Sequence, residues 1–123
     1  MAKKVLIIDD EPMIVKVLSL RFEQSGYGVV SAFNGEEGLE VVKKEKPDLI
    51  LLDIGIPVID GNTLCELIKN DKDLKHIPVI MLTGKKLVGD MEDAFKAGAD
   101  IYVNKPYDWH RLLEHVRKLV GPA

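Results

Sequence analysis

The stretch Asp-Leu-Ile-Leu-Leu-Asp-Ile-Gly-Ile-Pro-Val-Ile-Asp-Gly, residues 48–61, decides how the rest of the chain is interpreted. Four consecutive apolar residues precede Asp53, and Gly55 and Pro57 follow it closely. An apolar run this short, bounded by turn residues, is typical of a strand buried on both faces in the middle of a parallel sheet. We therefore expect Asp53 at the carboxyl end of that strand, where open α/β sheets form their ligand crevice.

Length and composition indicate one domain, which we expect to span residues 1–123. The formal net charge of −3 provides no basic field for direct contact with nucleic acid. The single cysteine excludes an internal disulfide, and no apolar run approaches the roughly 20 residues of a membrane span. The apolar run after the first residues is too short for a signal peptide. We expect a cytoplasmic protein that directly contacts neither nucleic acid nor membrane.

Short apolar runs alternate with amphipathic segments along the chain. The runs predict strands at residues 5–8, 27–32, 49–52, 77–82 and 101–103. Helical stripes follow them, formed by Ile14, Val17, Leu18 and Phe22; Leu39 and Val42; Leu64, Leu67 and Ile68; Met91, Ala94 and Phe95; and Leu112, Leu113, Val116, Leu119 and Val120. This alternation predicts an α/β fold of the (βα)5 doubly wound, flavodoxin-like kind, with a five-stranded parallel sheet and helices on both faces.

The ends of the expected helices carry suitable residue types. Capping side chains are expected from Asn34, from Asp60 or Asn62, and from Asp108. Residues 84–89 are polar and flanked by glycines, which indicates a loop between the fourth strand and the fourth helix.

Polar side chains stand at the expected carboxyl ends of the strands: Asp9, Asp10, Asp53, Thr83 and Lys105. If the first strand lies beside the third, the usual order of a five-stranded doubly wound sheet, the three carboxylates meet in one pocket. Such a cluster is costly without a cation, and hard oxygen ligands suit Mg²⁺. Carboxylates, Mg²⁺, a lysine and a hydroxyl together indicate a phosphoryl site in which an aspartate attacks in line. A lone aspartate of this kind would more simply be a helix cap or a loop residue.

The chain resembles the receiver domains of two-component response regulators over essentially its whole length. The resemblance rests on Asp-Asp-Glu at 9–11, on Asp53 with Pro57 and Asp60-Gly61 downstream, on Thr83, and on Gly98-Ala99-Asp100 before Lys105-Pro106. Each piece alone is weak, but their order and their positions at strand ends make the match specific. The chain is therefore identified as a member of this family, of the single-domain chemotaxis type.

The resemblance assigns the metal and phosphoryl chemistry to matching residues. Asp53 would accept a phosphoryl group from the phosphohistidine of a histidine kinase. Asp10, Asp53 and the backbone carbonyl of Gly55 would ligate Mg²⁺ directly, and Asp9 would act through a bound water. Lys105 would pair with the phosphoryl group.

The resemblance also implies a switch. Thr83 would hydrogen-bond the phosphoryl group once it has arrived, and Tyr102 would turn inward as Thr83 moves. The family has a cis peptide bond at the step that corresponds to Lys105–Pro106, in agreement with the rule that cis peptides occur at proline.

The implied partners are a histidine kinase or phosphotransfer protein and a downstream protein target. Because the chain ends at Ala123 without an output domain, we expect a protein contact made by the fourth helix, fifth strand and fifth helix. The domain would catalyse its own phosphotransfer and autodephosphorylation, but it would not be a turnover enzyme.

Two other functions agree with part of the pattern. A Mg²⁺-dependent phosphatase of the haloacid dehalogenase type also uses an aspartate nucleophile, but it places that residue after the first strand in an Asp-x-Asp arrangement. A pseudo-receiver that only binds partners would be expected to lack one of the acidic pair, Thr83 or Lys105, and none is missing. Cys65 and the three histidines are interpreted as packing or surface residues.

Overall fold

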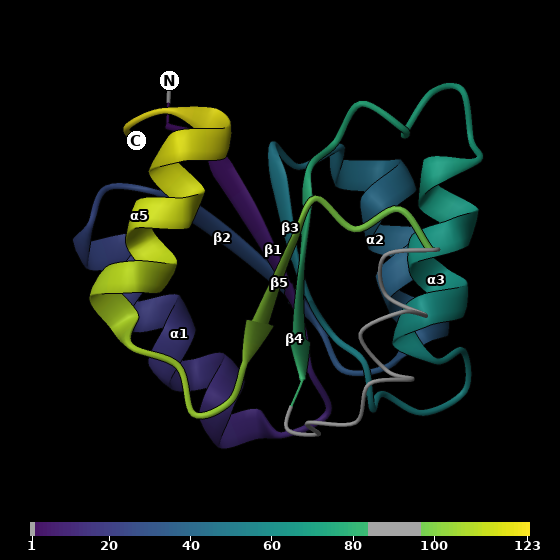
Figure 1. Cartoon of the computed structure of the whole chain (residues 1–123), viewed down its shortest axis with the longest axis horizontal. Helices are drawn as coiled ribbons and strands as arrows, with labels where there is room; N and C mark the ends of the chain where they lie inside the picture. The colour runs from purple at the N-terminus through teal and green to yellow at the C-terminus, as the bar shows by residue number, and fades with distance from the viewer. Residues whose placement is uncertain (1, 84–96) are drawn as a thin grey trace.

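The computed structural model describes residues 2–83 and 97–123, and their strands form one parallel sheet. The elements along the chain are β1 (Lys4–Ile8), α1 (Pro12–Gln24), β2 (Gly28–Ala32), α2 (Gly35–Glu45), β3 (Leu49–Asp53), α3 (Gly61–Lys69), β4 (Val79–Thr83), β5 (Ile101–Asn104) and α5 (Trp109–Val120). The strand order is β2-β1-β3-β4-β5, with α1 and α5 on one face and α2 and α3 on the other (Figure 1). The predicted doubly wound α/β fold is confirmed.

The helix expected around Met91, Ala94 and Phe95 lies outside the described residues, as does the loop expected at 84–89.

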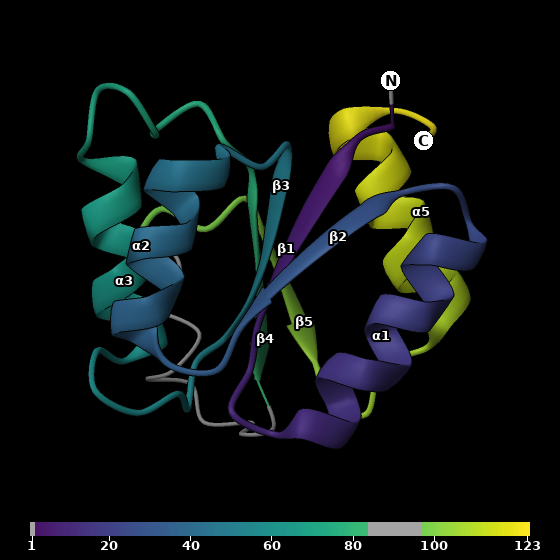
Figure 2. The ribbon, with the colours of Figure 1, turned by 180° about the vertical axis from the view of Figure 1, so that it is seen from behind.

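The central strands of the sheet are buried on both faces, and β3 and β4 are apolar up to their last residues, Asp53 and Thr83. All five residues of β3 and of β4 are buried. Side chains of β1, β3 and β4 point alternately into two hydrophobic clusters, one against α2 and α3, the other against α1 and α5. Figure 2 shows the same two layers of helices from behind. The buried sheet therefore provides a rigid support for side chains at the ends of its strands.

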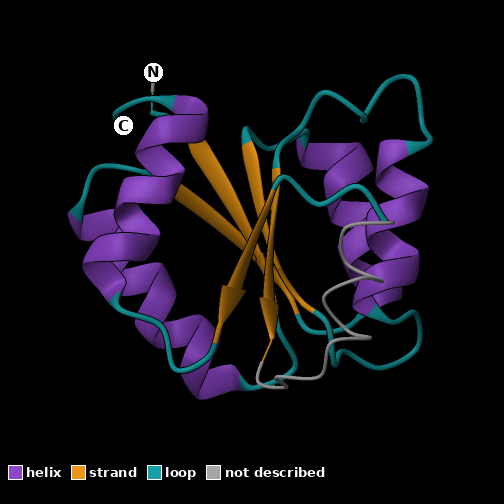
Figure 3. Cartoon of the chain, in the orientation of Figure 1, coloured by secondary structure: helices purple, strands orange, loops and turns teal. Residues whose placement is uncertain are grey.

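The strand register brings the carboxyl ends of the central strands to one edge of the sheet. Ile8 pairs with Leu52, Asp53 with Leu82, and Thr83 with Asn104. The arrowheads of β4 and β5 point toward this edge in Figure 3. The residues that directly follow β1 and β5, Asp9 and Lys105, therefore lie close to the end of β3.

Local signals at the helix ends are confirmed. The side chain of Asn34 accepts a hydrogen bond from the Glu37 N–H at 2.8 Å, and that of Asp108 accepts one from the His110 N–H at 2.9 Å. Of the two caps considered for α3, Asp60 is the one observed, since its Oδ1 accepts from the Thr63 N–H at 2.9 Å.

Two residues expected on buried helix faces are exposed instead. In α1 the buried side chains are Val15, Leu18 and Phe22, whereas Val17 is 46% exposed. At 100° per residue, Val17 lies on the side of α1 opposite that buried face. Leu67 of α3 is likewise exposed, because Leu64, Cys65 and Ile68 define the buried arc. Among the described residues, no helix is both long and apolar enough to cross a membrane.

Candidate functional site

Three aspartates form an acidic cluster at the carboxyl edge of the sheet. One carboxylate oxygen from each of Asp9, Asp10 and Asp53 lies within 4.8 Å of the others. Asp9 and Asp53 are only 1% and 9% exposed, whereas Asp10 is exposed to solvent. The Glu11 N–H donates to Asp9 Oδ1 at 3.0 Å and orients that carboxylate. The predicted convergence of the three carboxylates is therefore observed.

Lys105 supplies the positive charge of this site. Its Nζ lies 3.3 Å from Asp9 Oδ2 and 3.5 Å from Asp53 Oδ1. The backbone N–H of Lys105 donates to the carbonyl of Thr83 at 2.6 Å, which ties the β5 end to the β4 end. The peptide bond between Lys105 and Pro106 is cis, as predicted. One ammonium thus faces two carboxylates, with a third close by.

Burial and like charge shape the electrostatics of the cluster. Burial raises the pKa of Asp53, and the charge of Asp9 raises it further, while Lys105 and a backbone hydrogen bond from Gly55 act in the opposite direction. Burial lowers the pKa of Lys105, but the charges of Asp53 and Asp9 outweigh burial and leave it above its ordinary value. The site therefore carries more negative than positive charge. Three carboxylates at this spacing are the hard oxygen donors that suit a divalent cation such as Mg²⁺.

The loop after β3 holds Asp53 in place through close backbone contacts. The Gly61 N–H donates to the Ile54 carbonyl at 3.0 Å. A Cβ at Gly61 would lie 2.6 Å from the Asp53 carbonyl oxygen, so the start of α3 packs directly on the strand end. Gly55 also lies beside the carboxylate, since a Cβ there would be 4.0 Å from Asp53 Oδ2.

The two residues predicted to form the switch lie on neighbouring strands. Thr83 is buried at the end of β4, one residue beyond Leu82, the partner of Asp53. Tyr102 of β5 pairs with Met81 and packs against the cluster beneath α2 and α3. Thr83 and Tyr102 therefore lie on β4 and β5, the two strands that come after β3 in the sheet order. The movement of their side chains on phosphorylation stays a prediction.

Three features near the site were missed from the sequence. Val58, in the loop after β3, has a φ of 72°, a left-handed conformation that is rare for a β-branched residue. Exposed apolar side chains line α1, and a cavity lies between β5 and α5. The spacing of Met13, Val17 and Leu20 could have indicated the α1 stripe, because positions three and four apart share one helix face.

Comparisons with known proteins agree with this geometry. A family model described as the response regulator receiver domain matches residues 5–117. The polar-differentiation response regulator DivK of Brucella anthropi is 35% identical over 123 residues, covering 100% of both chains. The DNA-binding dual master transcriptional regulator RpaA of Synechocystis is 39% identical over 117 residues, which are 95% of this chain and 48% of RpaA. This chain thus spans about half the length of RpaA.

A solved structure of another receiver domain has the same fold. The receiver domain of a sensor histidine kinase from Pseudomonas aeruginosa has a TM-score of 0.90 and 26% identity, covering 98% of this chain and 99% of that one. It is described as having a magnesium ion coordinated in the active site cleft.

Proposed function

This chain belongs to the response regulator receiver domain family, and we propose that Asp53 is the residue on which it accepts a phosphoryl group. Receiver domains are the phosphoryl-accepting signalling modules of two-component systems. The observation that carries the assignment is the position of Asp53, almost buried in the acidic cluster with Lys105 Nζ 3.5 Å from its Oδ1. A carboxylate that is held this rigidly beside an ammonium is arranged for in-line attack.

Each side chain of the site has its own proposed role in phosphoryl transfer. A carboxylate oxygen of Asp53 attacks the phosphorus of a phosphohistidine, the P–N bond breaks, and its electron pair stays on the imidazole nitrogen. The ammonium of Lys105 pairs with the phosphoryl oxygens, and the Thr83 hydroxyl donates to one of them after transfer. Asp10, Asp53 and the carbonyl of Gly55 are the proposed direct ligands of Mg²⁺, with Asp9 acting through water. When bound, Mg²⁺ supplies positive charge that offsets the charge of the phosphoryl oxygens.

The two alternative functions are less well supported. In this chain Asp53 is the last residue of β3, the third strand, whereas a haloacid dehalogenase phosphatase would place its nucleophile after the first strand. A pseudo-receiver would not need Lys105 between Asp9 and Asp53, where the structure has it. We propose a signalling module that transfers a phosphoryl group to itself and does not turn over an external substrate.

The phosphoryl donor is proposed to be a histidine kinase or a phosphotransfer protein that docks on α1. Met13, Val17 and Leu20 are 69%, 46% and 51% exposed and share one face of the helix. The stripe begins three residues after Asp10, so an apolar surface adjoins the site. A donor helix packed on it would bring a phosphohistidine to Asp53.

The downstream partner is proposed to be a protein that contacts β5 and α5; the fourth helix of that predicted surface lies outside the described residues. RpaA is named as DNA-binding, but this chain matches only 48% of it and has a net charge of −3. We therefore propose no direct contact with nucleic acid. We propose a cytoplasmic location, because a relative of this chain, RpaA, is named as a DNA-binding transcriptional regulator.

Acetyl phosphate with Mg²⁺ tests the assignment of Asp53. Wild type should gain one phosphoryl group that hydroxylamine removes, and Asp53→Asn should gain none. Asp73→Asn, which neutralises an exposed loop aspartate, is the matched control and should label like wild type. Stoichiometric label on Asp53→Asn, or a base-stable and acid-labile adduct, would refute the assignment.

The α1 surface is tested separately from the chemistry. Changing Met13, Val17 and Leu20 to Ser should slow transfer from a phosphohistidine-bearing donor but leave labelling by acetyl phosphate unchanged. Leu67→Ser, an exposed apolar residue of α3, is the control. If the α1 variant and the control lose transfer equally, α1 is not the docking surface.

A further inference from the structure

The loop that follows β3 is contacted by a helix that contributes no side chain to the acidic cluster. We call residues 54–60 the β3–α3 loop; it contains Gly55, whose carbonyl is a proposed ligand of Mg²⁺. The N–H of Gly35, the first residue of α2, donates to the Pro57 carbonyl of this loop at 3.1 Å. The first N–H groups of a helix have no partner within it, so they can bind another segment. Figure 2 shows the start of α2 at the same end of the molecule as this loop.

Gly35 brings α2 and the β3–α3 loop so close together that no side chain fits between them. A Cβ at Gly35 would lie 2.6 Å from the Cβ of Ile59 and would overlap the Ile59 carbonyl oxygen. A backbone oxygen cannot rotate away from such an overlap as the end of a flexible side chain can. Any larger residue at this position must therefore push the loop away from α2 or turn the peptide group of Ile59.

The β3–α3 loop has a strained backbone. The Ile59 N–H also donates to the Pro57 carbonyl, at 3.0 Å, so these residues form a three-residue turn with Val58 in the middle. The φ of Val58 is 72°, which is the form of the γ-turn that is rare and strained. Strained backbone persists only where the surrounding structure holds it. The hydrogen bond from Gly35 is one contact that holds this turn from outside the loop.

The same loop carries the backbone groups that face the metal site. The Gly55 N–H hydrogen-bonds the carboxylate of Asp53, and a Cβ at Gly55 would lie 4.0 Å from Asp53 Oδ2. Mg²⁺ demands near-ideal octahedral geometry, with ligand oxygens at about 2.0–2.1 Å. A shift of the loop therefore changes how well the Gly55 carbonyl and the Asp53 carboxylate fit one ion.

We propose that Gly35 is a positioning residue of the metal site: its N–H and its lack of a side chain set the path of the β3–α3 loop and thereby place the Gly55 carbonyl. The proposal rests on the proposed function, because it takes this carbonyl and Asp53 as ligands of Mg²⁺. Groups that orient metal ligands without touching the ion typically change metal affinity by about 10- to 100-fold when they are altered.

Gly35→Ala tests the proposal, with Gly38→Ala as the matched control. Both variants add one methyl group to α2, but a Cβ at Gly38 would lie 2.8 Å from Ile8 Cδ1, the end of a side chain, and not against the loop. Heteronuclear spectra of the full chain, titrated with Mg²⁺ in the absence of a phosphoryl donor, give the dissociation constant. Gly35→Ala should bind Mg²⁺ about 10- to 100-fold more weakly than wild type, whereas Gly38→Ala should bind it like wild type.

The same spectra separate positioning from a loss of stability. Both added methyl groups should lower the free energy of unfolding. That loss changes the folded fraction, but not the dissociation constant measured on the resonances of the folded state. Without metal, the amide resonances of Ile54 and Gly55 should shift in Gly35→Ala and stay in place in Gly38→Ala. The Mg²⁺ concentration that half-saturates labelling of Asp53 by acetyl phosphate should rise by the same factor as the dissociation constant.

Asn34→Ala provides the test if Gly35→Ala does not fold. The Asn34 side chain accepts the Glu37 N–H at 2.8 Å, so its removal loosens the helical turn that carries Gly35 without adding an atom. Affinity for Mg²⁺ should fall in this variant as well, because the donor to the β3–α3 loop is then held less firmly.

Wild-type affinity for Mg²⁺ in Gly35→Ala would overturn the proposal, as would wild-type affinity in Asn34→Ala if Gly35→Ala does not fold. An equal loss of affinity in Gly38→Ala would also overturn it, because the effect would then not come from the contact with the loop. A wild-type chain that neither binds Mg²⁺ nor is labelled at Asp53 refutes the proposed function instead. Normal binding and labelling of wild type, together with unchanged affinity in Gly35→Ala, refute only the positioning role.

Discussion

Removing the charge of Asp53 is expected to stabilise the metal-free protein. Burial, followed by the charge of Asp9, raises the pKa of Asp53 in the folded state. A carboxyl group whose pKa is higher in the folded than in the unfolded state destabilises the fold at any pH above both values. The loss begins near the unfolded pKa of about 3.9 and is complete once the pH has passed the folded pKa. Asp53→Asn removes this unfavourable contribution, so the variant should melt higher than wild type in chelator.

Mg²⁺ should offset the same destabilisation, because it binds the assembled cluster and not the unfolded chain. At ten times its dissociation constant, such a ligand contributes about 1.4 kcal/mol. For 123 residues, an unfolding entropy of about 2.1 cal/mol/K per residue amounts to about 0.26 kcal/mol/K. The wild-type midpoint should therefore rise by about 5 °C. Asp53→Asn, which lacks one proposed ligand, should gain much less.

Thermal melting at pH 7, followed by circular dichroism in chelator and in Mg²⁺, provides the measurement. Asp73→Asn is the control for removing one negative charge far from the cluster, and it should respond to Mg²⁺ like wild type. A wild-type midpoint that Mg²⁺ leaves unchanged would contradict the reasoning. So would an Asp53→Asn midpoint below that of wild type in chelator, because the buried charge would then not be unfavourable.

Three further predictions concern the loop after β3 and the core. Val58→Gly should raise the free energy of unfolding by about 1 kcal/mol in urea, because relief of the left-handed strain exceeds the added entropy of the unfolded chain; no gain would mean that the turn is not strained. Gly61→Ala should lower it by about 1–3 kcal/mol, since its Cβ would lie 2.6 Å from the Asp53 carbonyl oxygen. Gly55→Ala, with no contact closer than 4.0 Å, should change it far less, and equal losses would contradict the packing argument. The thiol of Cys65, whose pKa burial raises to about 11, should resist alkylation at pH 8 until urea unfolds the chain, and rapid native-state reaction would refute that burial.

The fold could be predicted because its signals are local and agree with one another. The run before Asp53 contains four apolar residues in a row, and the observed strand Leu49–Asp53 is buried throughout. Asn34 and Asp108 cap their helices through hydrogen bonds to residues two or three positions away. Such caps could be predicted because both partners lie in the same short stretch of sequence. Strand ends differ from the prediction by one or two residues, as at β4, since pairing with neighbouring strands sets them.

The residues of the site could be predicted because the sheet topology brings strand ends that are distant in the sequence to one edge. Asp9, Asp53 and Lys105 are far apart in the sequence, but each stands at the end of a strand, and parallel strands end at one edge. The α1 stripe was misjudged because that helix is apolar on two sides, and periodicity alone does not say which side meets the sheet. The cavity between β5 and α5 could not be predicted, since it depends on how far α5 lies from β5, a distance that no local pattern sets.

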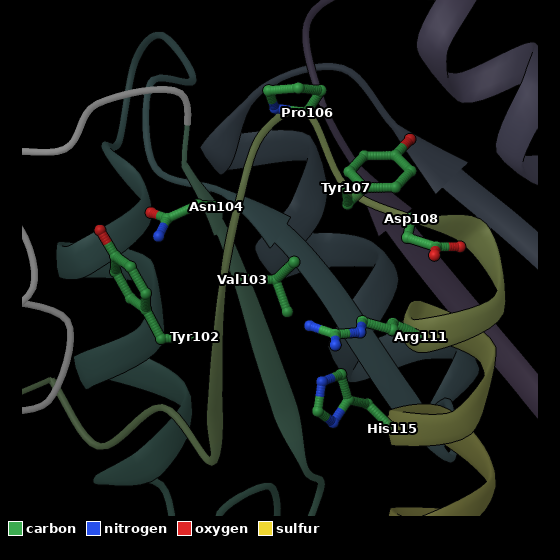
Figure 4. A pocket seen from close by; sticks show the side chains of 8 residues that line it. All are labelled: Tyr102, Val103, Asn104, Pro106, Tyr107, Asp108, Arg111 and His115. Carbon is green, nitrogen blue, oxygen red and sulfur yellow. The ribbon is translucent and has the colours of Figure 1, made fainter.

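Lys105 connects the phosphorylation of Asp53 to the proposed partner contact at β5 and α5. Phosphorylation replaces the single charge of the Asp53 carboxylate by roughly two negative charges, so the ammonium gains a stronger partner than the carboxylates that lie 3.3 Å and 3.5 Å away. The Lys105 N–H donates to the Thr83 carbonyl at 2.6 Å, so a shift of the Lys105 side chain affects Asn104 and Pro106, which line the cavity between β5 and α5 (Figure 4). Coupling between two sites is reciprocal: if phosphorylation of Asp53 favours a bound partner at β5 and α5, a bound partner favours phosphorylation by the same free energy. A partner that binds more tightly when beryllofluoride, an acyl-phosphate mimic, occupies the site must therefore raise the affinity for beryllofluoride by the same factor. A partner whose affinity beryllofluoride leaves unchanged would show that Lys105 leaves the two sites independent.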